Sequence, residues 1–137
     1  MLLYVSAQIT GAVLASAVLY CLFPEHATQA ATLPVNSYTQ AFVIEVLLSF
    51  ILMFVIVSVS EGSKETGKMA GIAIGGVVAL EALFAGPITG ACMNPARSIE
   101  PALFSGELQY LSLYSAAPIV GMLLTTWFCK LTQAKAA

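Results

Sequence analysis

The sequence predicts an all-α membrane protein, and three observations lead to that class. Hydrophobic residues make up 59% of the 137 residues and charged residues only 9%, and the mean hydropathy is +0.91. Soluble domains usually carry about 25% charged residues. The apolar residues also fall into long stretches, each near the roughly 20 residues that a helix needs to cross a bilayer. A lipid bilayer is therefore the expected partner. The net charge of −2, without a basic patch, gives no reason to expect nucleic acid.

Four expected spans follow one another, at residues 1–23, 39–60, 69–86 and 109–130. The first ends at Pro24. It lacks the basic start of a signal peptide and is long for the apolar region of one, so a span is favoured. The third covers Met69–Leu83 and extends at most to Gly86, because Gly86 and Pro87 are expected to break the helix. The charged residues 61–68 are expected to form a turn.

The basic residues predict the orientation of the chain. Four spans place the turn at residues 61–68 and the C-terminus on one side of the membrane. Those two regions hold all the lysines: Lys64, Lys68, Lys130 and Lys135. The positive-inside rule then places both termini in the cytoplasm and the spans in the cell membrane. Arg97 is the one basic residue on the other side.

The cysteines give no sign of a metal site or a disulfide framework. Cys21, Cys92 and Cys129 are odd in number and form no CxxC or Cys/His pattern. We interpret them as apolar, space-filling side chains. We expect no metal and no cofactor. We also expect no enzyme, because the sequence has no Ser/His/Asp set and no phosphate-binding loop.

The segment at residues 86–106, GPITGACMNPARSIEPALFSG, differs from the four spans. Asn94 followed by Pro95 is typical of a helix start, with a cap residue and then proline at the first helical position. The helix expected at residues 94–104 is too short to cross a bilayer. We therefore predict a re-entrant half-helix whose irregular entry is buried in protein or lines a water-filled cavity.

The N-terminus of such a half-helix has a physical use at mid-membrane. Its free N–H groups and positive dipole end repel cations, while a neutral molecule is little affected. The Asn94 amide adds donors, and an arginine at membrane depth, Arg97, normally faces a polar cavity. The alternatives are that Asn94-Pro95 is an ordinary cap and that Arg97 extends to the membrane interface.

Thr89 to Ser98, TGACMNPARS, resembles the second signature loop of the aquaporin and glycerol-channel family. The resemblance covers nearly the whole chain, because residues 1–23 are similar to the family's third helix and residues 109–130 to its sixth. It implies an aquaporin-like bundle of two inverted repeats, here with four spans and one half-helix. It also implies passive passage of water and small neutral solutes, and a homotetramer with one pore per subunit.

The resemblance also implies roles for individual residues. Three match the family's second Asn-Pro-Ala motif: Asn94, Pro95 and Ala96. Arg97 matches the arginine of the outer selectivity filter, and two further filter positions fall on Ala82 and Ala91. Alanine at both implies a wide filter, as in nodulin-type and bacterial members that admit glycerol, urea or undissociated metalloid acids. Ser98 stands where glycerol channels usually have aspartate.

Two acids lie within the predicted spans. Glu45 matches the acidic residue of the family's fourth helix, which implies that it braces the re-entrant loop. Glu81, Thr89 and Gly90 are assigned to the same support. An alternative interpretation is a proton-coupled carrier that uses Glu45 and Glu81.

The chain departs from the family in one large respect, because the first two helices and the first Asn-Pro-Ala motif have no counterpart in it. A truncated gene, a partial gene model and a genuine short channel all remain open. A non-conducting membrane fragment is therefore a further alternative. The expectation is that the chain conducts as part of a complete six-span channel.

Overall fold

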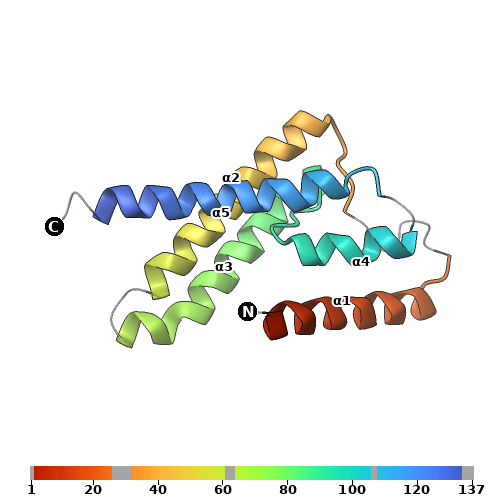
Figure 1. The fold of residues 1–137 in the computed structure, drawn as a ribbon, viewed down its shortest axis with the longest axis horizontal. Helices are drawn as coiled ribbons and strands as arrows, with labels where there is room; N and C mark the ends of the chain where they lie inside the picture. Colours follow the sequence, from red (N-terminus) through yellow and green to blue (C-terminus); the bar gives the residue numbers. More distant parts are fainter. Residues whose placement is uncertain (1, 26–31, 61–63, 106–107, 134–137) are drawn as a thin grey trace.

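The computed structural model describes residues 2–25, 32–60, 64–105 and 108–133. Within these ranges every regular element is an α-helix (Figure 1). The helices are α1 (Leu2–Leu22), α2 (Tyr38–Ser60), α3 (Lys64–Thr89), α4 (Pro95–Ser105) and α5 (Leu111–Gln133). All except α4 are long and apolar enough to cross a membrane. The predicted all-α membrane class is confirmed. Residues 61–63 of the expected turn, and Lys135, lie outside the described residues.

Helix α3 is longer at both ends than the sequence suggests. It begins at Lys64, inside the segment expected to be a turn, and it continues through Gly86 and Pro87 to Thr89. The prediction that Gly86-Pro87 breaks the helix is therefore wrong. Proline within a membrane helix is tolerated where other groups satisfy the affected backbone. Here the Gly90 N–H still donates to the Gly86 carbonyl at 2.9 Å, which continues the helical pattern beyond the proline.

Two further contacts hold the last turn of α3. The Val35 N–H donates to the Ile88 carbonyl at 3.1 Å, and the Tyr114 hydroxyl of α5 donates to the Thr89 carbonyl at 2.6 Å. These carbonyls have no intrahelical partner at a helix end. The helix then ends at Gly90, whose φ of +80° is a left-handed conformation that glycine adopts readily.

Helix α2 crosses α5 on the side of the molecule away from α1 (Figure 1). It packs against both α3 and α5, whereas α4 packs against α5 and α1. Helices α2 and α5 approach closely at Gly121, where an added Cβ would lie 2.4 Å from the Val46 carbonyl oxygen. Among the described helices, α1 contacts only α4. Most apolar side chains of α1 are exposed, as expected for a surface that faces lipid.

Two buried apolar clusters lie on either side of the short segment that joins α3 to α4, residues 90–94, which we call the 90–94 loop. Cys92 belongs to the cluster formed with Ala41, Leu113 and Tyr114. Ala91 and Met93 belong to the cluster formed with Leu48 and Ala85. The side chains of consecutive loop residues thus pack into different clusters, so the loop has packing contacts on both sides.

Candidate pore site

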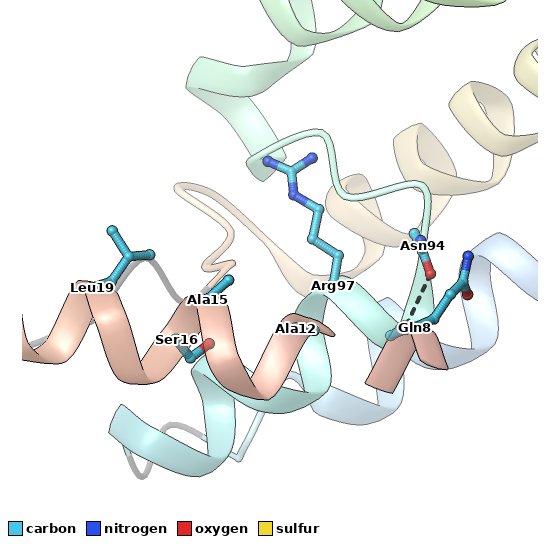
Figure 2. Close-up of a pocket in the computed structure, with 8 residues that line it drawn as sticks. Gln8, Ala12, Ala15, Ser16, Leu19, Asn94 and Arg97 are labelled. Carbon is cyan, nitrogen blue, oxygen red and sulfur yellow. Dashed lines mark hydrogen bonds between the residues drawn. The ribbon is translucent and has the colours of Figure 1, made fainter. Parts of the chain in front are cut away.

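The half-helix α4 begins where the Asn-Pro pair predicts. Pro95 is its first residue, and the Asn94 Oδ1 accepts the Ala96 N–H at 3.0 Å (dashed in Figure 2). The Asn94 carbonyl accepts the Arg97 N–H at 3.2 Å. Asn94 therefore caps the helix through its side-chain oxygen, and its Nδ2 amino group remains as the donor for another partner.

The 90–94 loop reaches Asn94 through an unusual backbone. Besides Gly90, two residues with side chains have positive φ angles, Ala91 at 43° and Met93 at 54°. Such conformations cost of order 1–3 kcal/mol each and persist only where the surroundings impose them. The loop must therefore be held by specific contacts.

Glu45 of α2 supplies those contacts. Its Oε1 accepts the Thr89 hydroxyl at 2.8 Å and the Cys92 N–H at 3.0 Å. Its Oε2 accepts the Met93 N–H at 2.9 Å. The side chain is fully buried, with 0% exposed. Hydrogen bonds to a carboxylate are among the stronger ones in proteins, so this one residue holds the backbone at Cys92 and Met93.

A second set of contacts orients the arginine. The Arg97 Nη1 donates to the Ala91 carbonyl at 3.1 Å. The Thr89 hydroxyl accepts the Ala91 N–H at 3.1 Å, so the peptide groups on both sides of Ala91 are used. The guanidinium is thereby turned toward the loop rather than along α4 (Figure 2). The Ala91 carbonyl accepts one of its N–H groups, and the exposed side chain lines the cavity.

A cavity of about 520 Å³ lies between α1 and the start of α4. Asn94, Ala96 and Arg97 line one wall, and α1 forms the opposite wall (Figure 2). The lining residues of α1 are Gln8, Ala12, Ala15, Ser16 and Leu19. The cavity thus combines apolar side chains with polar groups on both walls, Gln8 and Ser16 on α1 and Asn94 and Arg97 opposite. That arrangement is typical of a site that orients small polar molecules.

The other predicted filter residues are placed differently. Ala82 is exposed on α3 and does not line this cavity. Ala91 is 1% exposed, and its side chain packs with Leu48 and Met93. Only the carbonyl of Ala91 reaches Arg97. The filter role of both alanines stays a prediction.

The two buried acids differ sharply in their surroundings. Glu45 accepts bonds from three donors. Glu81 is also buried, at 2% exposed, but neither carboxylate oxygen has a hydrogen-bond partner among the described residues. The bracing role predicted for Glu81 therefore has no contact to support it in the described part of the chain.

Several polar contacts near the loop are not evident from the sequence. Thr32, in the linker before α2, bonds to Ser98 of α4 with 3.0 Å between the hydroxyl oxygens. Ser98 in turn lies 2.7 Å from the Cys92 sulfur, and the Cys92 thiol donates to the Asn94 carbonyl at 2.9 Å. No local pattern marks Thr32, because its partner lies 66 residues away.

Known proteins are similar to this chain over most of its length. A family model described as Major intrinsic protein matches residues 1–129. Aquaporin NIP1-1 of Zea mays is 45% identical over 125 residues, which are 90% of this chain and 44% of that protein. Nodulin-26 of Glycine max is 44% identical over 125 residues, 90% of this chain and 46% of that protein. Aquaporin NIP3-1 of Arabidopsis thaliana is 44% identical over 132 residues, 90% of this chain and 41% of that protein.

The chain therefore spans less than half the length of these curated relatives. The match includes all four apolar helices apart from the end of α5, and the half-helix between them. Because the family model covers nearly the whole chain, this membrane protein belongs to the major intrinsic protein family.

Proposed function

We propose that this chain forms part of a passive channel for water and small neutral solutes. The observation that supports the proposal best is the cavity wall formed by Asn94 and Arg97 at the N-terminus of α4. The family to which the chain belongs includes relatives named aquaporins. Catalysis, a cofactor and a metal have no place in this function.

The proposed selectivity follows from charge and hydrogen bonding. The N-terminal end of α4 carries a partial positive charge, and the Arg97 guanidinium adds a full one nearby. A cation that enters the cavity meets both, whereas a neutral molecule does not. The Asn94 Nδ2 and the free N–H groups of Arg97 donate hydrogen bonds to an oxygen of the solute, replacing those that it leaves in water.

The solute range proposed for the complete channel includes glycerol, urea and undissociated metalloid acids. By the family resemblance, Ala82 and Ala91 stand at filter positions of the complete channel, where small side chains imply a wide path. One of the curated relatives, at 44% identity, is named Nodulin-26. Ser98 follows Arg97 where glycerol channels usually have aspartate, so glycerol is one candidate among several.

The complete channel is proposed to have six spans, with two half-helices meeting at mid-membrane. The described chain contributes one half-helix. We propose a homotetramer in the cell membrane with both termini of this chain in the cytoplasm, as the lysine distribution predicts.

The test is a chimera in which the first half of nodulin-26 precedes this chain, reconstituted in liposomes. Stopped-flow light scattering then measures the rates of osmotic water flux and of glycerol and urea entry. Water and at least one of these solutes should pass, without dependence on a pH gradient. A chimera that inserts and assembles but leaves liposomes as impermeable as empty ones would refute the proposal.

Glu81 favours a second candidate, a proton-coupled carrier. Its buried carboxylate has no partner among the described residues, which is a feature of groups that bind and release protons. Glu45 argues against this function, because three donors hold its carboxylate in a structural role. Solute accumulation against its gradient, driven by a pH difference across the liposome membrane, would establish the carrier instead.

A further inference from the structure

Residues 32–35, at the end of the linker between α1 and α2, contact the last turn of α3, the start of the 90–94 loop and α4. Beyond the backbone bond from Val35 to Ile88, the contacts come from one side chain, that of Thr32. Its methyl group lies against Gly90, where an added Cβ would be 2.7 Å from the Thr32 Cγ2. Its hydroxyl bonds to Ser98, in the first turns of α4. One side chain therefore bridges the entry to the loop and the helix that leaves it.

The hydroxyl contact belongs to a chain of hydrogen bonds whose direction can be deduced. The Asn94 carbonyl can only accept, so the single proton of the Cys92 thiol is donated to it at 2.9 Å. The Cys92 sulfur then accepts the proton of Ser98. The Ser98 oxygen is left to accept from Thr32. Thr32 is thus the first donor in a chain that ends on the backbone of Asn94.

We propose that Thr32 is a positioning residue for the site formed by Asn94 and Arg97, an inference that rests on the proposed channel function. The linker would then be part of the pore support, equivalent on its side of the loop to Glu45 on the other. Glu45 holds the N–H groups of Cys92 and Met93. Thr32 acts through Ser98 on the Cys92 thiol and so on the Asn94 carbonyl, which also accepts the Arg97 N–H.

Threonine suits this position because it carries a methyl and a hydroxyl group on the same carbon. Each can be removed separately. Thr32→Val keeps the shape and removes the donor, whereas Thr32→Ser keeps the donor and removes the methyl group. A further valine substitution, Thr126→Val, is a matched control, because the exposed Thr126 hydroxyl bonds only to the Met122 carbonyl within its own helix.

The test uses the Cys92 thiol as a reporter in the full chain reconstituted in lipid. Cys92 is 2% exposed, so N-ethylmaleimide can reach it only when the loop opens. Peptide mass spectrometry measures its modification rate beside those of Cys21, which is exposed, and Cys129. Loss of one hydrogen bond predicts that Thr32→Val accelerates Cys92 modification roughly three- to tenfold. Cys129 should keep its rate, Thr32→Ser should restore slow modification, and Thr126→Val should have no effect.

Three results would overturn the proposal. One is Cys92 reacting as fast as Cys21 in the unmodified chain. Another is an unchanged Cys92 rate in Thr32→Val, and a third is acceleration by Thr32→Ser alone, which would assign the effect to methyl packing. If Thr32→Val also accelerates the modification of Cys129, the whole protein has become less stable. The variant Ser98→Ala then decides whether the hydrogen-bond chain matters. That variant must accelerate Cys92 alone, and adding Thr32→Val to it must produce no further increase.

This experiment is independent of permeation, so its failure and the failure of the proposed function are distinguishable. A second measurement connects the two. In the nodulin-26 chimera, Thr32→Val should change the ratio of glycerol to water permeability, and Thr32→Ser should restore it. The ratio of glycerol to water permeability could instead be equal in the unmodified, Thr32→Val and Thr32→Ser chimeras, although Thr32→Val exposes Cys92. That result would show that Thr32 only stabilises the loop, and it would reject a positioning role.

Discussion

The Glu45 carboxylate accepts the backbone N–H of Met93 at 2.9 Å, across 48 residues of sequence. This bond joins a membrane span to a loop residue whose φ is 54°. A buried charge and a strained backbone are each unfavourable alone. Together they stabilise each other, because the carboxylate finds donors and the loop finds an acceptor.

We expect Glu45→Ala to destabilise the chain by more than any other single substitution near the loop. It leaves the N–H groups of Cys92 and Met93 buried without an acceptor, at about 1–3 kcal/mol for each. Thermal unfolding in detergent, followed by circular dichroism, measures the loss. Gln40→Ala, at an exposed position of the same helix, is the control. Equal melting temperatures for the two variants would contradict the bracing role.

Arg97→Val in the nodulin-26 chimera should admit larger solutes and weaken cation exclusion. The substitution removes the positive charge of the cavity wall and the bond to the Ala91 carbonyl. Glycerol and urea uptake should rise relative to water flux, and liposomes loaded with a pH dye should leak protons faster. If all of these permeabilities stay at the level of the unmodified chimera, Arg97 is not a filter residue.

Ala82→His tests the width of the filter. A histidine at this exposed position of α3 should suppress glycerol and urea entry more than water flux, because it narrows the path and adds a polar ring. Stopped-flow traces for water, glycerol and urea provide the comparison. The idea fails if the unmodified chimera passes water alone, since there would then be no wide filter to narrow.

Gly121→Ala should weaken the crossing of α2 and α5. The new methyl group would lie 2.4 Å from the Val46 carbonyl oxygen, so the two helices must separate. Overpacking of this kind typically costs about 1–3 kcal/mol. Gly75→Ala is the control, because its Cβ would meet nothing within 4 Å. Equal melting temperatures for Gly121→Ala and Gly75→Ala would show that α2 and α5 accommodate the added methyl group without loss of stability.

Liposomes that contain only this chain should swell no faster than empty ones. The cavity between α1 and α4 has one half-helix terminus, and one such terminus shields only half of a transmembrane path. A two-fold dimer could bring two Asn94 half-helices together, but α1 has no evident place in it. Rapid water flux with a low activation energy from the chain alone would make that dimer the leading arrangement.

The sequence predicted those features that depend on local chemistry. Long apolar runs form helices in lipid because the backbone must satisfy its own hydrogen bonds there, so the class of fold was accessible. The Asn94-Pro95 pair predicted the start of α4 because capping is a property of adjacent residues. The family resemblance supplied the Glu45 brace, which no periodicity could indicate.

What the sequence did not predict depends on distant partners. Pro87 normally breaks a helix, yet α3 continues past it, with the Thr89 carbonyl held by Tyr114 of another helix. Thr32 lies in a linker without a motif, and its role depends on where Ser98 is placed in space. The left-handed φ of Ala91 and the packing of its side chain in a buried cluster likewise depend on partners distant in the sequence.

The sparse contacts of α1 have a consequence for biosynthesis. Among the described helices its only neighbour is α4, which the ribosome makes after both α2 and α3. Until then none of the described helices packs against α1, and its mean hydropathy of 1.7 suits a helix surrounded by lipid. Helix α4 has the opposite dependence, since it is too short to cross alone and needs α1 and α5 beside it. The last step of insertion is thus the one that creates the cavity.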